Sequence, residues 1–267
     1  MITIVQYGDS GTGKTTRSLL SSRWGPTCLF DFDGHGPTAK SNAVELKLIT
    51  PEQAEQIKIV NLANLSSKQV LDTVYDTIVD ELKKPSPSFS TFIYDTYTSF
   101  EDHMINYYLP QYDVGSRHFG SARQTLKAGS SVDITVMGTN DYAVLKAGVF
   151  KFLKSVKRLG INVILNAHLR EPTETKMDVK EQGTLKAAGE LRKIIPTEFT
   201  AVNRLYIDGY GKRAAQGAAT TRFMAKPGTT LSNLRKFDYK SWGLEMFDLQ
   251  AYKLEDGPPQ DEPKNAA

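Results

Sequence analysis

The chain has 267 residues, 40% of them hydrophobic, and its 33 basic and 30 acidic residues give a net charge of +3. This size suits one large α/β domain or two small ones, and the balanced charge neither requires nor excludes a nucleic-acid partner. No run of 18 apolar residues is present, which excludes a membrane-spanning helix of ordinary length. Residues 1–5 lack the basic start of a signal peptide, and the one cysteine, Cys28, lies in an apolar run typical of packing in a reducing compartment. We therefore expect a cytoplasmic protein.

Short apolar runs alternate with longer helical patterns through the first two thirds of the chain. Buried strands are expected at residues 2–7, 27–32, 91–95 and 161–166, with further strands at 44–49 and 57–62. Helices are expected at 15–23, 66–84 and 140–159, and the second opens with the capping-box spacing of Ser66 and Gln69. The polar, Gly-rich residues 33–42 are expected to form a loop. Strands that alternate with helices predict an α/β fold, with a mostly parallel sheet and helices on both of its faces.

The last third of the chain has a different pattern. Strands are expected at 203–208 and 220–225, joined by a loose hairpin loop at 209–219, which favours an antiparallel extension at one edge of the sheet. Residues 111–138 are rich in Gly, Ser and Gln and predict a flexible insertion. The acidic, Pro-rich residues 251–267 predict a disordered tail, which leaves one domain over residues 1–250.

A phosphate-binding loop lies between the first strand and the first helix. Residues 8–15 match the pattern G-x-x-x-x-G-K-[ST], whose glycines let backbone N–H groups turn toward phosphate oxygens. Lys14 is placed to reach the β- and γ-phosphates, and the Thr15 hydroxyl is placed to ligate Mg²⁺. A chance match in a chain of this length has a probability on the order of one per cent. The pattern predicts that ATP, or a related triphosphate, binds with Mg²⁺ at Gly8, Asp9, Ser10, Gly11, Thr12, Gly13, Lys14, Thr15 and Thr16.

Two further polar residues are expected at the ends of buried strands. Asp95 ends the strand at 91–95, and we expect it to hold Mg²⁺ together with Thr15. The alternative is that Asp95 caps the helix that follows. His168 ends the run that begins at 161, where an imidazole can contact the γ-phosphate and report its hydrolysis; the alternative is an ordinary satisfied polar residue.

Hydrolysis also needs a carboxylate that orients the attacking water. The second strand leads into Asp31-Phe32-Asp33, and strand alternation places the two aspartates on one face, with Asp33 at the carboxyl tip where ligands bind in such sheets. Asp33 is therefore the candidate base, and its alternative role is to cap the loop beside Gly34. The candidate catalytic residues are then Lys14, Asp33, Asp95 and His168.

In this order the four markers resemble the RecA-like branch of P-loop ATPases. More narrowly, the chain resembles the compact ATPases of bacteriophages described as RecA-like single-strand annealing proteins. The resemblance implies a RecA-like ATPase core with residues 8–15 as Walker A, Asp33 as the catalytic acid, Asp95 as Walker B and His168 as the phosphate sensor. Members of the family typically carry Glu at the catalytic position, so the shorter Asp33 predicts slow ATP turnover.

The resemblance also implies a task on nucleic acid, since the loops after the Walker B and sensor strands face DNA in RecA-like proteins. Candidate DNA-binding residues in these stretches are Arg117, Arg123, Lys127, Arg170, Lys176 and Lys180. The alternative is that these are solvated loop charges, offset by acidic neighbours. Residues expected to reach a neighbouring subunit's γ-phosphate as a trans-acting finger are Arg213, Arg235 and Lys236.

The leading hypothesis is thus an ATPase that forms a homo-oligomer on single-stranded DNA and acts in phage-type recombination or strand annealing. It would work in the cytoplasm of a bacterial host, with DNA-stimulated turnover and a single-strand-binding protein as a further partner. One alternative is a helicase-like, loader or packaging motor ATPase. A second alternative is a P-loop kinase acting on a small molecule.

Overall fold

The computed structural model of the chain describes residues 1–111, 124–128, 132–136, 139–174, 179–211, 213–217 and 219–226. Several sequence predictions lie outside these residues: Arg117, Arg123, Lys176, Arg235, Lys236 and the tail at 251–267.

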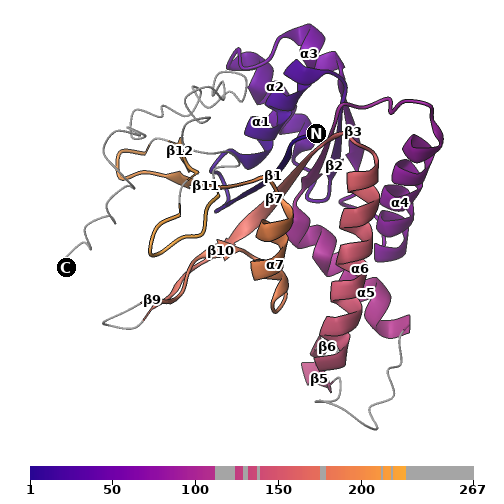
Figure 1. Cartoon of the computed structure of the whole chain (residues 1–267), viewed down its shortest axis with the longest axis vertical. Coiled ribbons are helices and arrows are strands. Elements are labelled where there is room, and N and C mark those ends of the chain that lie inside the picture. The colour runs from indigo at the N-terminus through magenta and orange to yellow at the C-terminus, as the bar shows by residue number, and fades with distance from the viewer. Residues whose placement is uncertain are drawn as a thin grey trace.

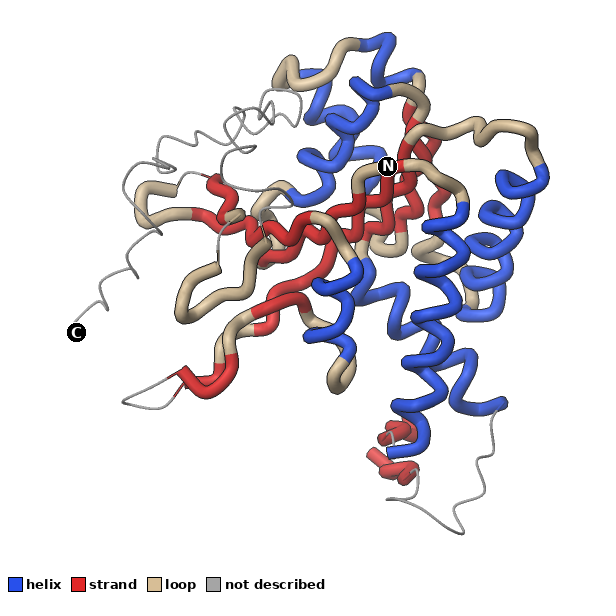
Figure 2. Tube along the Cα trace, in the orientation of Figure 1, coloured by secondary structure: helices blue, strands red, loops and turns tan. Residues whose placement is uncertain are grey.

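A twisted, mostly parallel sheet forms the centre of the molecule (Figures 1 and 2). Its strands run in the order β12-β11-β1-β7-β4-β2-β3. Their bounds are β1 (Thr3–Gly8), β2 (Thr27–Asp31), β3 (Ile57–Asn61), β4 (Thr91–Asp95), β7 (Asn162–Arg170), β11 (Ala201–Ile207) and β12 (Arg213–Gln216). All neighbours along this path are parallel except β11 and β12, and the short β10 (Thr184–Leu185) pairs antiparallel with β7. The predicted fold class, including the antiparallel edge, is confirmed.

Helices cover both faces of this sheet, because successive side chains of each strand point to opposite faces. In β4, Phe92 and Tyr94 join one apolar cluster, and Ile93 between them joins another. The first face is covered by α4 (Ser67–Lys83), α5 (Tyr97–Gln111), α6 (Thr139–Arg158) and α7 (Leu191–Glu198). The second face is covered by a 3₁₀ helix (Leu19–Trp24) that continues α1 (Lys14–Ser18), and by α2 (Gly36–Glu45) and α3 (Pro51–Glu55).

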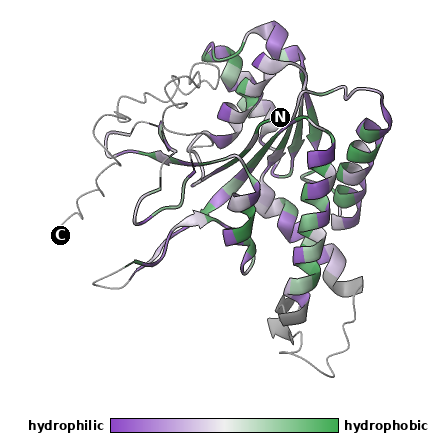
Figure 3. Ribbon diagram, in the orientation of Figure 1, coloured by the Kyte–Doolittle hydropathy of each residue, from purple (hydrophilic) through white to green (hydrophobic). Residues whose placement is uncertain are grey.

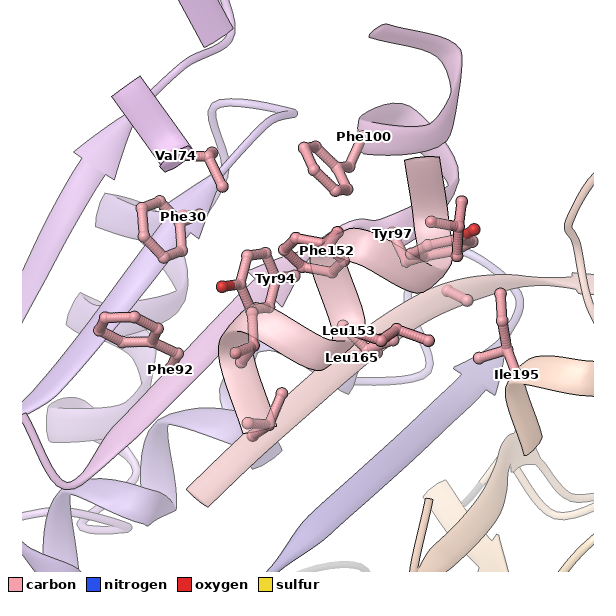
Figure 4. Packing of buried hydrophobic residues seen from close by; sticks show 14 of the residues in the cluster. Phe30, Val74, Phe92, Tyr94, Tyr97, Phe100, Phe152, Leu153, Leu165 and Ile195 are labelled. Carbon is pink, nitrogen blue, oxygen red and sulfur yellow. The ribbon is translucent and has the colours of Figure 1, made fainter. Parts of the chain in front are cut away.

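Aromatic rings fill the larger of the two clusters. The Tyr94 ring lies 5.0 Å from that of Phe30 and 4.9 Å from that of Phe152, and Phe100 lies 4.8 Å from Phe152 (Figure 4). Figure 3 shows the apolar strands enclosed by helices whose polar sides face outward. This packing fixes α5 and α6 against the sheet. Because α5 begins only two residues after Asp95, the same packing fixes the surroundings of the site.

The capping-box prediction for the second long helix is confirmed. The Ser66 hydroxyl accepts a hydrogen bond from the Gln69 backbone N–H, and the Gln69 side chain accepts one from the Ser66 backbone N–H at 3.0 Å. The two reciprocal bonds satisfy donors that the first turn of a helix leaves unpaired, which explains where α4 starts.

Two predictions about residues 33–49 were wrong. The stretch expected as a loop followed by a strand forms helix α2, whose Ala39 and Ala43 pack into the second cluster. The cause is Asp31, whose buried carboxylate accepts hydrogen bonds from the backbone N–H groups of residues 34, 35 and 36 at 2.8, 3.1 and 2.7 Å. This carboxylate supplies the acceptors that a helix start needs, although glycines and Pro37 dominate the local sequence.

Three further differences concern segments with weak or misleading periodicity. Helix α5, which buries Tyr97, Phe100 and Met104, and helix α7 were not predicted. The strand expected at 220–225 is reduced to isolated bridges at Phe223 and Lys226, and β12 lies inside the expected loop at 209–219. Within the expected insertion, β5 (Gln124–Ala128) and β6 (Val132–Val136) pair as an antiparallel hairpin. Among the described helices, none is both long and apolar enough to cross a membrane.

Helix α5 carries a buried carboxylate, Glu101, which is 4% exposed. The Tyr97 hydroxyl donates to its Oε1 at 2.8 Å, and the Ala188 backbone N–H donates to its Oε2 at 2.7 Å. Burial disfavours the charged form and raises the pKa of Glu101 to about 7, although both hydrogen bonds act in the opposite direction.

This pKa predicts how stability depends on pH. Between the ordinary Glu pKa of 4.5 and about 7, the unfolded chain loses its proton while the folded chain keeps it, so stability falls as pH rises. Glu101→Gln has no ionisable group at this position, so it lacks this pH-dependent loss of stability. The free energy of unfolding of the variant relative to wild type should therefore increase between pH 5 and pH 8 by up to about 3 kcal/mol. Urea unfolding of both proteins at the two pH values measures the change, and a difference independent of pH would contradict the assignment.

Candidate nucleotide-binding site

The phosphate-binding loop runs from the end of β1 to the start of α1, and two glycines shape it. Gly13 caps α1 with a φ of 87°, a backbone conformation that residues with a side chain rarely adopt. A Cβ on Gly8 would lie 2.1 Å from the Leu205 carbonyl oxygen of β11, so only glycine fits where the loop leaves the sheet. The loop is thus pressed against β11 and directs its backbone toward the start of a helix, the geometry that binds phosphate.

Lys14 is buried beneath this loop, 6% exposed. Its ammonium group donates to the carbonyl oxygens of Gly8 at 2.9 Å and Asp9 at 2.7 Å. Burial lowers the pKa of Lys14, and the nearby carboxylates of Asp95, Asp9 and Asp33 oppose that change. The ammonium group is therefore held at the loop by polar partners that phosphate oxygens can replace.

Thr15 and Asp95 form the candidate metal site. The Thr15 hydroxyl donates to Asp95 Oδ2 at 2.6 Å, and the Asn166 amide donates to Asp95 Oδ1 at 2.9 Å. Burial raises the pKa of Asp95, whereas these two hydrogen bonds lower it. A hydroxyl and a carboxylate side by side fit Mg²⁺, which prefers oxygen ligands and is usually held by one or two carboxylates together with substrate phosphates.

A chain of buried polar groups fixes the orientation of Asn166. Its Oδ1 lies 2.8 Å from the Ser18 hydroxyl and 3.2 Å from Gln6 Nε2, and Gln6 in turn accepts a hydrogen bond from Arg17. Donors at Oδ1 leave the Asn166 N–H groups facing Asp95. The prediction for this strand singled out His168 and missed Asn166, although a polar residue inside a run of Val, Ile and Leu was a usable signal.

The structure separates the two aspartates after β2. Asp31 is fully buried and caps the start of α2, whereas Asp33 lines a cleft at the carboxyl end of the sheet. The Ser99 hydroxyl donates to Asp33 Oδ1 at 2.6 Å and lies 3.0 Å from the Thr96 hydroxyl. The Ser99 hydroxyl, itself in contact with Thr96, thus holds the candidate base in place.

His168 lines the same cleft from β7. Its backbone N–H donates to the Thr98 hydroxyl at 3.1 Å, one residue before the Ser99 that holds Asp33. Burial, followed by the charge of Lys14, lowers the pKa of His168, so the imidazole is neutral at pH 7.

The cleft has a volume of about 330 Å³ and brings most of the predicted site together. Predicted residues that line it are Ser10, Gly11, Gly13, Lys14, Thr15, Thr16, Asp33, Asp95, His168 and Arg213. Sequence reasoning missed Thr96, and it missed His35 and three residues of α2, namely Thr38, Ala39 and Asn42, because that segment was expected to be a loop.

Arg213 was predicted as a finger that reaches a neighbouring subunit. In the single chain its Nε donates to the Gly11 carbonyl oxygen at 3.1 Å, so the guanidinium lies at its own phosphate-binding loop, and its role between subunits stays a prediction. Of the predicted DNA-binding residues, Lys127 lies in β5, Lys180 is exposed on β9 (Val179–Glu181), and Arg170 is paired with Glu181 at 2.7 Å.

Comparison with known proteins gives a family. The sequence matches the family model AAA_24, described as an AAA domain, over residues 1–228. No curated protein matches. Among solved structures, the RadB recombinase is similar with a TM-score of 0.45 and 15% identity, covering 80% of this chain and 79% of its own. A KaiC-like protein from the archaeon Pyrococcus horikoshii is similar with a TM-score of 0.43 and 12% identity, covering 84% and 82%. Since the family match spans most of the sequence and includes the phosphate-binding loop, the chain belongs to the AAA_24 family of AAA domains.

Proposed function

We propose that this protein binds and hydrolyses ATP with Mg²⁺ in the cleft, and that it acts as an oligomer on single-stranded DNA in phage-type recombination or strand annealing. The observation that carries the ATPase half is the meeting of Lys14, Asp33, Asp95 and His168 in one cleft. Asp95 and His168 lie toward the carboxyl ends of β4 and β7, and Lys14 and Asp33 follow β1 and β2. These four strands are neighbours in the sheet.

The residues divide the work of hydrolysis between them. Backbone N–H groups of the loop and the Lys14 ammonium bind the β- and γ-phosphates, and Thr15 and Asp95 hold Mg²⁺. The metal ion neutralises charge on the phosphates. Asp33 accepts a proton from a water whose oxygen forms a bond to the γ-phosphorus as the bond to ADP breaks. Ser99 occupies one oxygen of Asp33, which leaves Oδ2 for the water.

Two arms support the proposed DNA half. The β5–β6 hairpin and the hairpin of β8 (Thr173–Glu174) with β9 both project from the body of the molecule (Figure 1). They contain or adjoin the predicted cations Lys127, Arg170 and Lys180, and cations on projecting segments suit a flexible phosphate backbone. Arg213, Arg235 and Lys236 are the candidates for the finger between subunits in this proposal, and Arg213 already lies at the phosphate-binding loop of its own chain.

The first prediction concerns phosphate binding. Lys14→Ala removes the one ammonium group held at the loop, so ATP·Mg²⁺ should bind roughly ten- to hundredfold more weakly, as expected for a lost charge-assisted hydrogen bond. Calorimetric titration measures the affinity. Lys83→Ala, which removes a cation of similar chemistry from the exposed end of α4, is the control and should leave the affinity unchanged.

The second prediction concerns the candidate base. Asp33→Asn should bind ATP normally and lose hydrolysis, and Ser99→Ala should lower kcat about tenfold with unchanged nucleotide affinity, because an unheld carboxylate orients water poorly. Ser99→Thr keeps the hydroxyl and should restore kcat. Adding Ser99→Ala to Asp33→Asn should have no further effect. If Asp33→Asn turns over at the wild-type rate, the base is another residue.

The third prediction concerns DNA. A fluorescein-labelled single strand should bind at low salt, more weakly as salt rises, and should stimulate ATP turnover. Anisotropy and ATPase assays test both effects, and mass measurement with and without the strand tests assembly. Absence of binding at low salt, with and without a non-hydrolysable ATP analogue, would refute the DNA half while leaving the ATPase half intact.

A further inference from the structure

One carboxylate on the β8–β9 arm is surrounded by three cations. Glu181 Oε2 lies 2.7 Å from Nη2 of Arg170, the residue that ends β7. Its Oε1 lies 3.3 Å from Arg192 Nη2 and 3.9 Å from Lys193 Nζ, both in the first turn of α7. Two elements, β7 and α7, thus place three cations at a single acidic side chain of β9, and we call these four residues the Glu181 cluster.

The Glu181 cluster has a surplus of positive charge, with three cations for one carboxylate. Its side chains are accessible, with exposed fractions of 29% for Arg170, 21% for Arg192, 62% for Lys193 and 33% for Glu181. Hydrogen bonding from Arg170, then the charge of Arg192, lowers the pKa of Glu181, so the carboxylate is ionised at neutral pH. Accessible ion pairs of this kind contribute little each, so another anion can displace the carboxylate at small cost.

Glu181 also engages only part of the hydrogen-bonding capacity of the two guanidinium groups. Each contacts Glu181 through one nitrogen, Nη2, and not through the paired fork that Arg forms with phosphate. Arg192 Nε is buried and has no hydrogen-bond partner among the described residues. A tetrahedral phosphate offers more acceptor directions than a planar carboxylate, so it suits three converging cations better.

We propose that the Glu181 cluster is a binding site for a backbone phosphate of single-stranded DNA, and that Glu181 occupies this site until the strand displaces it. This inference rests on the proposed function and adds a residue that limits affinity. The site is distinct from the ATP cleft: Arg170 lies two residues beyond His168 on β7, and none of the four residues lines the cleft. Figure 1 shows β9 and α7 on either side of the short β10, next to this end of β7.

The same arm provides a matched control. Glu174 on β8 pairs with a single cation, Arg222, at 2.7 Å. Its side chain is 30% exposed, close to that of Glu181. Glu174→Gln and Glu181→Gln change the net charge equally and at similar depth, but only Glu181→Gln releases three cations. Any difference in DNA affinity between the two variants is therefore due to the Glu181 cluster and not to the overall charge.

The experiment measures binding of a labelled oligothymidine to full-length wild type, Glu181→Gln and Glu174→Gln over a range of salt. Glu181→Gln should tighten binding roughly three- to tenfold and steepen the salt dependence by about one unit of slope, because one more phosphate is neutralised by protein. Glu174→Gln should have a smaller effect. Arg192→Gln should weaken binding and, combined with Glu181→Gln, should cancel the gain.

The remaining outcomes distinguish failure of the proposed function from failure of the proposed phosphate site. If no variant binds the strand although ATP hydrolysis is intact, the DNA half of the proposed function fails and this inference with it. If the strand binds but Glu181→Gln and Glu174→Gln are equal, or Glu181→Gln binds more weakly, the function stands and the phosphate site is refuted. If inorganic phosphate raises the melting temperature of Glu181→Gln while its DNA affinity stays at the wild-type value, the cluster takes small anions and the backbone assignment is wrong.

Discussion

The contact between Thr15, Asp95 and Asn166 is the constraint around which the site is organised. A carboxylate only 3% exposed is costly to bury, and hydrogen bonds from a helix start and from a neighbouring strand offset that cost. Because Thr15 lies in the first turn of α1, Asp95 ends β4 and Asn166 lies in β7, one buried carboxylate holds three elements in register. The sheet order β1-β7-β4 makes this possible. It places β7, which carries Asn166, between β4, which ends at Asp95, and β1, which leads through the phosphate-binding loop to Thr15.

Residues next to Asp95 extend the same organisation to the reactive groups. The Ser99 hydroxyl in the first turn of α5 contacts both Asp33 and the hydroxyl of Thr96, which precedes the helix, and the Thr98 hydroxyl accepts a hydrogen bond from the backbone of His168. The apolar core determines where this turn lies, since Tyr97 and Phe100 of the same segment are fully buried among aromatic rings. The first turn of α5 therefore serves both the core and the site: its apolar residues pack into the core, and the hydroxyls of Thr98 and Ser99 contact His168 and Asp33, which line the cleft.

The sequence was sufficient wherever a function resides in contiguous residues or in the end of an apolar strand. The phosphate-binding loop, Asp95 and the strand that carries His168 were located in this way, and the roles of Lys14, Thr15, Asp33, Asp95 and His168 remain predictions. Contacts between distant segments were not accessible: Asp31 converts a Gly- and Pro-rich stretch into α2 by accepting three backbone N–H groups. In the same way, the sequence indicated that acidic neighbours could offset Arg170 but could not identify its partner, because Glu181 is brought near it only by the folding of the β8–β9 arm.

The adjacency of Thr98 and Ser99 has a mechanical consequence. Two consecutive residues of one helical turn touch two separate strands, one through the tip of β7 and the other through the residue that follows β2 by two positions. A rigid helix cannot shift one of these residues without the other, so any displacement of α5 along its axis is transmitted to both strands together. The carboxylate of Asp33 and the backbone of His168 are therefore linked through one helical turn, so a displacement of that turn would move the proposed base and the proposed phosphate sensor together.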